Sequence, residues 1–241
     1  MSGHSKWSTI KRKKGAKDAK RGVVFTQLSK DITIAAKEGG ENQEMNAALR
    51  LAIKKAKQAN MPNDNIERAI NKGIGNLPGV IFEDFIYEGY GPFGVAILME
   101  VMTDNKNRTV PDIRHIMSKN NGNLGESGCV SWMFKKKGTI TIDVKGKDED
   151  EALEKVFELG IDDIEIIDKT LEISTSPEFF SKASGILEEL GYEIDGNVGL
   201  VPDNYSELSI EEAEKVIFLI ESLEELDDVQ RVYSNFVVKD K

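Results

Sequence analysis

The residues best suited to binding chemistry are the cations of the first 21 positions. This segment holds eight Lys or Arg residues and a single acid, Asp18, on a chain of 241 residues whose formal net charge is −10. Lys and Arg side chains bind phosphate oxygens, and the indole ring of Trp7 suits stacking on a base. The segment therefore indicates nucleic acid as a partner, with a solvated basic tail as the alternative. The candidate contacts are Lys6, Trp7, Lys11, Arg12, Lys13, Lys14, Lys17, Lys20 and Arg21, together with Lys54 and Lys55.

The positive charge continues beyond this segment. Residues 1–80 hold 16 basic and 7 acidic residues, whereas residues 81–241 hold 16 basic and 35 acidic ones. Halves of opposite charge gather phosphate ligands at one end of a protein and repel them from the other. If about six cations contact phosphates, the logarithm of the binding constant falls against the logarithm of salt concentration with a slope near −5, at about 0.9 per contact with duplex DNA.

Side chains for catalysis or metal binding are sparse. His4 and His115 have no partner at the spacing of a catalytic triad or a metal site, and the single Cys129 excludes an intramolecular disulfide and a multi-cysteine zinc site. The acids of segment 162–165 lack the spacing of a calcium loop. The glycines of segment 120–128 lack the lysine and the strand-to-helix setting of a phosphate loop. We predict no enzymatic activity, no cofactor, no metal and no small-molecule substrate.

The sequence also bears on cellular location. The longest apolar stretch, Val95–Met102, is interrupted by Glu100 and is too short to span a bilayer. The basic N-terminus lacks the apolar central run of a secretory signal, and its lysines outnumber its arginines, unlike most transit peptides. We expect a cytoplasmic protein with no membrane partner.

The cations must be positioned by a small helical domain. Residues 1–16 mix Gly, Ser and Lys without apolar periodicity, which predicts a flexible arm that folds on its target. Beyond the arm, apolar residues recur at helical spacing, and a Gly-rich linker begins at Gly73. Helices are expected from Lys17 to Gly39, from Asn46 to Asn60 and from Asp64 through Ile70. Residues 1–79 are thus predicted to form a basic three-helix domain.

The rest of the chain predicts an alternation of strands and helices. Strands at 81–87 and 95–103 flank the turn Gly89–Pro92, followed by a helix at 110–119, a loop at 120–128 and a strand at 129–134. The next pattern is βαββαβ, which is ferredoxin-like: strand 139–144, helix 148–159, strands 164–168 and 171–174, helix 177–190 and strand 192–200. A helix at 209–226 and a strand at 229–238 then return to the earlier sheet.

These patterns define an α+β fold class with three domains. After the helical domain, residues 80–137 plus 201–241 are expected to form a mixed α/β middle domain. Residues 138–200 are expected to form an acidic ferredoxin-like domain inserted in the middle one.

Short motifs are spread from end to end of the chain. They are Gly3–Trp7, Lys17–Gly22, Met61-Pro62, Asp64–Ile66, Tyr87–Pro92, Thr103–Thr109 and Trp132–Phe134. Together they resemble the YebC/PmpR family, which is related to the mitochondrial translational activator of cytochrome oxidase subunit I. The resemblance implies three domains arranged around a cleft and no enzymatic activity.

The matched motifs add three candidate contacts in the cleft, Tyr87, Tyr90 and Arg108. Alternatively, Tyr87 packs in the hairpin and Arg108 caps the following helix. One departure from the family pattern is Phe93, which stands where the family usually has glycine.

The resemblance implies two functional accounts. One is a DNA-binding transcriptional regulator that acts at promoters. The other is a translation factor that acts on ribosomal RNA at the ribosome and relieves stalled synthesis, including at proline runs. A Lys-rich segment with one tryptophan suits RNA, which is recognised by shape, backbone and unstacked bases. The sequence contains no recognisable groove-reading motif, so we favour the translation factor, with the transcriptional regulator as the alternative.

Overall fold

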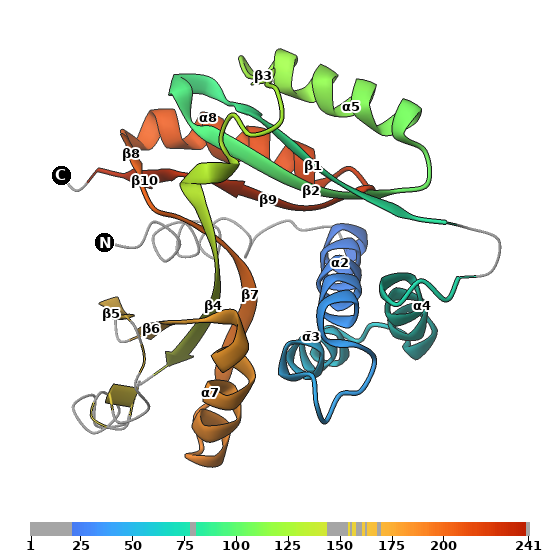
Figure 1. Ribbon diagram of the computed structural model, residues 1–241, viewed down its shortest axis with the longest axis vertical. Coiled ribbons are helices and arrows are strands. Elements are labelled where there is room, and N and C mark those ends of the chain that lie inside the picture. The colour runs from blue at the N-terminus through green and yellow to red at the C-terminus, as the bar shows by residue number, and fades with distance from the viewer. Residues whose placement is uncertain are drawn as a thin grey trace.

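The computed structural model describes residues 21–77, 81–143, 154, 156–157, 161, 163–167 and 170–239 (Figure 1). The described chain starts with three helices, α2 (Arg21–Gly39), α3 (Ala47–Gln58) and α4 (Asn63–Gly73). The Asn46 side chain accepts a hydrogen bond from the Leu49 backbone N–H at 3.0 Å and donates one to the Ala35 carbonyl at 2.8 Å. This residue therefore caps α3 and ties it to α2. The three predicted helices are confirmed, except that residues 17–20 lie outside the described part.

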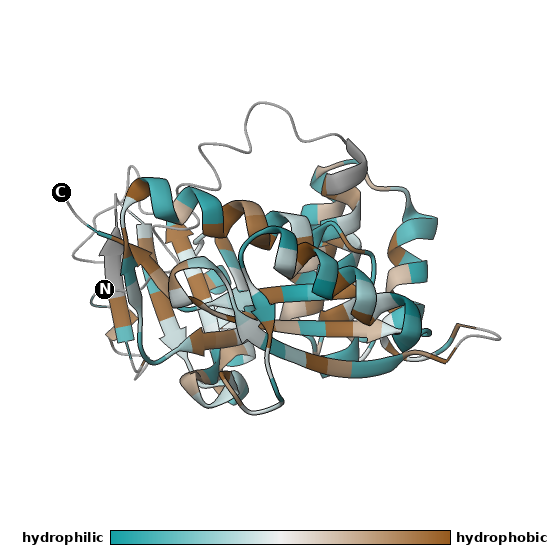
Figure 2. Cartoon of the chain, turned by 90° about the horizontal axis from the view of Figure 1, so that it is seen from above, coloured by the Kyte–Doolittle hydropathy of each residue, from teal (hydrophilic) through white to brown (hydrophobic). Residues whose placement is uncertain are grey.

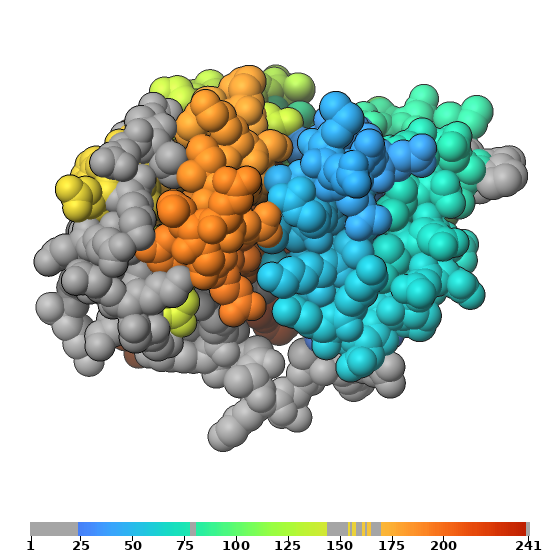
Figure 3. All heavy atoms as spheres, turned by 90° about the horizontal axis from the view of Figure 1, so that it is seen from below, coloured from blue at the N-terminus to red at the C-terminus, as the bar shows by residue number. Residues whose placement is uncertain are grey.

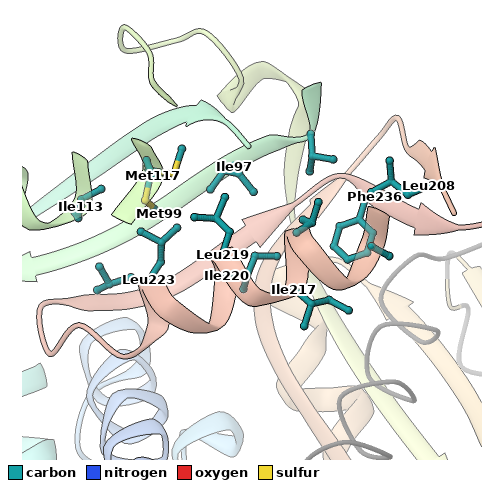
Figure 4. Close-up of a cluster of buried hydrophobic side chains, with 14 of the residues drawn as sticks. Ile97, Met99, Ile113, Met117, Leu208, Ile217, Leu219, Ile220, Leu223 and Phe236 are labelled. Carbon is teal, nitrogen blue, oxygen red and sulfur yellow. The ribbon is translucent and has the colours of Figure 1, made fainter. Parts of the chain in front are cut away.

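The middle of the molecule is an antiparallel sheet with strand order β3-β1-β2-β9. Its strands are β1 (Glu83–Tyr90), β2 (Ala96–Thr103), β3 (Asn123–Leu124) and β9 (Val229–Ser234). The helices α5 (Lys106–Lys119) and α8 (Ile210–Glu224) cover one face of the sheet. Alternate residues of β2, among them Ile97 and Met99, enter the core beneath these helices (Figure 4). Ala96 and Leu98 point to the opposite face and form a separate cluster.

The β1–β2 hairpin is confirmed, with a 3₁₀ turn at Pro92–Gly94. Phe93 in this turn has φ of +63°, a left-handed conformation that glycine adopts more easily. This conformation explains why glycine suits the position.

Two predictions about segment 106–134 are wrong. Helix α5 starts at Lys106, not at Val110, because the Asn105 side chain accepts from the Arg108 N–H and caps the helix. Residues 129–133 form no strand; a 3₁₀ turn occupies Ser131–Met133, and β4 starts only at Phe134. The backbone N–H groups of Val130 and Ser131 donate to Glu88, and that of Met133 donates to the Val130 carbonyl, so they are not available to a sheet.

A second antiparallel sheet has the order β5-β6-β4-β7. Its elements are β4 (Phe134–Asp143), β5 (Asp163–Ile167), β6 (Thr170–Thr175), α7 (Pro177–Glu189) and β7 (Ile194–Pro202). This is the strand order of a ferredoxin-like unit, although most of the predicted helix 148–159 lies outside the described residues. Beyond it, β8 (Ser206–Leu208) pairs in parallel with β10 (Phe236–Val238).

The helical part packs against both sheets. Ala47 and Leu51 of α3 belong to the core that lies between α7 and the ferredoxin-like sheet. Viewed from below, α7 lies beside α2 and α3 on one face of the molecule (Figure 3). Hydrophobic and hydrophilic residues alternate along the helices and strands (Figure 2).

The chain returns to the first sheet at its end, since β9 pairs with β2. This pairing supports our proposal that residues 138–200 are an insertion and that 80–137 plus 201–241 form one domain. No helix of the described residues has the length and apolarity needed to cross a membrane.

Candidate nucleic-acid interface

The eight predicted contacts from Lys6 to Lys20 lie outside the described residues, and Arg21 is the first residue of α2. Of the two predicted contacts on α3, Lys54 is exposed. Lys55 instead forms an ion pair with Asp195 of β7. The structure therefore separates the two α3 lysines, one facing solvent and the other facing a neighbouring domain.

Other cations of the helical part are also paired with acidic residues of the two sheet units. The Arg50 guanidinium lies 2.8 Å from the Glu188 carboxylate of α7, and Lys37 lies 2.5 Å from Asp84 of β1. Solvent-exposed pairs of this kind stabilise a protein by at most about 1 kcal/mol each. Their importance here is the charge they neutralise, because each joins the basic helices to the acidic remainder.

Lys30 makes the most buried of these contacts. Its ammonium donates to the backbone carbonyls of Glu224 at 2.5 Å and Leu226 at 2.8 Å, at the C-terminal end of α8. A cation is favourable there because the last carbonyls of a helix carry partial negative charge. Burial nevertheless lowers the pKa of Lys30 to about 8, against the attraction of Glu224 and Asp227. Lys30 thus fastens α2 to the middle domain.

A cleft of about 540 Å³ opens where α2, the ferredoxin-like sheet and β9 meet. Its charged lining residues are Asp31, Glu172, Asp195, Glu224 and Arg231. The Arg231 side chain is itself engaged, since Nη1 donates to the Val198 carbonyl at 2.7 Å. Acids therefore outnumber cations among the lining residues, and this cleft suits a phosphate backbone poorly.

The three residues proposed as cleft contacts do not line this cleft. Tyr87 packs at the edge of the core under α5 and α8, where burial raises the pKa of its hydroxyl. The Tyr90 hydroxyl donates to the Cys129 carbonyl at 3.2 Å. Arg108 lies at the start of α5 and is 2.9 Å from both Asp104 and Asp228. Tyr87 therefore follows the packing alternative, and Arg108 is an ion-pair residue beside a helix that Asn105 caps.

Glu88 is a structurally important residue that the sequence analysis missed. Its buried carboxylate accepts hydrogen bonds from the backbone N–H groups of Gly128 at 2.7 Å, Val130 at 2.8 Å and Ser131 at 2.7 Å. Burial raises the pKa of Glu88, but these hydrogen bonds outweigh it and hold the pKa below its usual value. The same loop presents Trp132, whose ring is 65% exposed.

The residues described contain no group of three or more His, Cys, Asp or Glu side chains placed to hold a metal ion. The described geometry therefore offers ion pairs between the domains and a cleft whose charged residues are mainly acids.

Comparisons with known proteins agree with this three-part α+β architecture. Residues 5–76 match the family profile described as the TACO1/YebC protein N-terminal domain, and residues 82–236 match the one described as the TACO1/YebC second and third domain. The fold and these matches define the class of three-part proteins in which a helical unit precedes two α/β units. The chain belongs to the TACO1/YebC family.

Relatives match over the full length of the chain. A protein of Dictyoglomus turgidum is 54% identical over 100% of this chain and 98% of its own length. A protein of Halothermothrix orenii is 52% identical over 100% of this chain and 97% of its own length. Both are named "Probable transcriptional regulatory protein". The crystal structure of a conserved hypothetical protein from Aquifex aeolicus is 46% identical, with a TM-score of 0.78 over 93% of both chains.

Proposed function

We propose that this protein is a non-enzymatic regulator of gene expression that binds nucleic acid through its basic N-terminal segment, residues 1–21. The observation that carries the proposal is the distribution of positive charge. Lys30, Lys37, Arg50 and Lys55 of the helical part hold the domains together. Residues 1–20 add seven cations against one acid. The segment is therefore the strongest source of positive charge outside the domain contacts.

We further propose that the target is ribosomal RNA and that the protein acts in the cytoplasm as a translation factor that relieves stalling, for example at proline runs. The placement of α3 favours this account over sequence-specific DNA binding. Lys55 and Arg50 hold α3 against β7 and α7. A helix that reads DNA must present a free face to the major groove, whereas a Lys-rich segment suits the backbone and unstacked bases of RNA.

The alternative is a transcriptional regulator that binds promoter DNA. It is supported by the names of the relatives from Dictyoglomus turgidum and Halothermothrix orenii. A positively charged segment also binds duplex DNA without sequence preference, since the phosphate contribution to affinity is independent of sequence.

The test compares the full chain with a variant lacking residues 1–21. Co-sedimentation with ribosomes and binding to promoter DNA are measured across a salt series. We expect ribosome binding to disappear with the segment, and DNA binding to be weak and equal for promoter and unrelated sequences. Undiminished binding of both targets by the truncated variant would exclude the segment as the anchor. Salt-resistant, promoter-specific binding would favour the transcriptional account.

A second assay tests the activity itself. Translation of a reporter that contains a proline run is measured in a cell-free system with and without the full chain. We expect the protein to raise the yield of this reporter relative to one without the run, and the truncated variant to have no effect. Equal yields with and without the full chain count against a role in stalling.

A further inference from the structure

A second pocket beside α2 has three cations among its lining residues. It has a volume of about 390 Å³ and lies between α2, α4 and the turn that joins α8 to β9. This volume falls in the range of about 300–1,000 Å³ that is typical of small-molecule sites. Its charged lining residues are Lys30, Arg68, Lys72 and Asp227. The net charge of the lining residues is therefore positive in this pocket, whereas it is negative in the neighbouring cleft.

Arg68 and Lys72 line this pocket and form no ion pair within 4 Å with a described carboxylate, although Asp228, Asp227 and Asp104 attract Lys72 at longer range. Arg68 is exposed, and Lys72 lies over the Phe82 ring, with its ammonium 4.6 Å from the ring centroid. The nearby Asp228 carboxylate already accepts from Thr103, Arg108 and Thr109. Arg68 and Lys72 remain available for an anion.

Gln230 adds an unsatisfied hydrogen-bonding group. Gln230 lines both this pocket and the acidic cleft and is 5% exposed. Its Nε2 group donates to the Asp227 and Asp228 carbonyls at 3.3 and 3.4 Å, whereas its Oε1 atom is buried and has no hydrogen-bond partner in the described structure. A buried acceptor without a partner costs stability, so such an atom calls for a donor that the protein does not supply. Because this oxygen is buried, the amide must turn toward the pocket before a ligand N–H group on a planar edge can donate to it.

The remaining lining residues supply apolar and hydroxyl-bearing surface. Phe25, Leu77 and Phe82 line the pocket, as do Thr26 and Ser29. Phosphate-binding cations, aromatic rings and an acceptor for an N–H donor are together what a single unstacked nucleotide requires.

We propose that this pocket binds one nucleotide, with its phosphate on Arg68 and Lys72 and its base against Phe82 and Gln230. The proposal rests on the proposed function in that nucleic acid is the partner. The nucleotide comes either from a single strand, as an unstacked base, or from solution as a free mononucleotide. In both cases the pocket adds base contacts to the one expected of Trp7 in the basic segment.

The test uses the full chain and adenosine monophosphate as the probe, with binding measured by calorimetry. We expect saturable binding, and binding of adenosine or ribose 5-phosphate at least about tenfold weaker, because each lacks one half of the recognised groups. The variant R68A/K72A should also weaken adenosine monophosphate binding by at least about tenfold, since charge-assisted hydrogen bonds are the strong ones. The matched control is R114A/K119A, which removes the same charges from exposed positions of α5 and should leave the affinity unchanged.

A further variant, Q230M, tests the base contact and should weaken the binding of adenosine monophosphate by about two- to tenfold. Circular dichroism of each variant verifies the fold. No saturable binding at millimolar adenosine monophosphate, or equal affinity in R68A/K72A and the control, would overturn the proposal.

Competition separates the two sources of the nucleotide. A short single-stranded RNA that displaces adenosine monophosphate from the full chain assigns the pocket to a strand; failure to displace it assigns the pocket to a free nucleotide.

Failure of the pocket proposal is distinguishable from failure of the proposed function. A chain that sediments with ribosomes but does not bind the mononucleotide contradicts only the pocket. A chain that binds the mononucleotide but neither ribosomes nor DNA contradicts the proposed function.

Discussion

Glu88 shows how one buried carboxylate fixes a loop. Three backbone N–H groups of residues 128–131 converge on it. Because those N–H groups have this partner, the apolar run Cys129–Phe134 becomes a turn followed by β4 instead of the strand that its composition suggests. No local pattern marks Glu88 for this role, since its partners lie about 40 residues further along the chain.

We expect Glu88→Gln to lower the free energy of unfolding by about 1–3 kcal/mol, because a carboxamide leaves a backbone donor unpaired. Glu126→Gln, at an exposed position of the same loop, is the control and should change stability by less than about 0.5 kcal/mol. Urea denaturation measures both. Because the pKa of Glu88 is lowered in the folded protein, its contribution is lost as pH falls through that pKa. Equal stability of the two variants at neutral pH would contradict the hydrogen-bonding account.

Lys30 gives a second prediction at the scale of one residue. Its pKa is about 8 in the folded protein and 10.5 ordinarily, because of burial. Between these values the folded protein releases a proton that the unfolded chain retains, so the contribution of Lys30 to stability rises with pH. The free energy of unfolding of the parent chain, relative to Lys30→Met, should therefore increase from pH 8 to pH 10 by up to about 1.4 kcal/mol per pH unit. Lys54→Met, on the exposed face of α3, is the control. A difference that stays constant with pH would show that Lys30 keeps its ordinary pKa.

At the scale of elements, the helices were the most predictable part of the fold. Apolar residues recur at helical spacing in α2 and α3, and such periodicity depends only on neighbours in sequence. Contacts between elements could not be predicted in this way. The ion pair of Lys55 with Asp195 spans 140 positions, so the sequence marks both charges but not their pairing. Lys55 was accordingly proposed as a nucleic-acid contact, and the structure places it in a domain contact.

The close approach of α2 and α4 depends on Gly73. A Cβ atom at this position would lie 2.3 Å from the Thr33 carbonyl oxygen, a contact that the backbone must move to relieve. We expect Gly73→Ala to lower the free energy of unfolding by about 1–3 kcal/mol. Gly185→Ala on α7 is the control, since its Cβ meets nothing within 4 Å, and it should raise stability by about 0.5–1 kcal/mol. Thermal denaturation measures both; stabilisation by Gly73→Ala would show that the two helices are not in tight contact.

At the scale of the whole molecule, charge does two things. The cations of the helical part pair with acids of both sheet units and hold the three parts together. The remaining positive charge of the helical part lies in residues 1–21, on the exposed Lys54 and Lys57 of α3, and at the pocket beside α4. The sequence predicted the opposed charge of the two halves. It could not separate these roles, because the role of each lysine depends on which acid the fold brings near.

The cleft was predicted as a contact surface from the family resemblance, with Tyr87, Tyr90 and Arg108 as its residues. The cleft beside α2 has four acids and Arg231 as its charged lining residues and does not include these three residues, whose role as contacts stays a prediction. On our account it repels phosphate, and nucleic acid is held by the basic segment and the pocket beside α4. The pocket combines residues of α2 and α4 with Phe82, Asp227 and Gln230 of the middle domain.

The most direct test of this account is the salt dependence of ribosomal RNA binding. The full chain is compared with K11Q/R12Q/K13Q/K14Q and with K57Q/R114Q/K119Q/K182Q, which neutralises three Lys and one Arg at exposed positions elsewhere. If the four segment cations bind phosphates, the slope of log K against log salt becomes shallower by about 0.7–0.9 for each phosphate that the variant no longer neutralises. We predict that the slope is shallower by about 3 in the segment variant and equal to that of the full chain in the control. Equal slopes in all three proteins would contradict the claim that the basic segment anchors the protein to RNA.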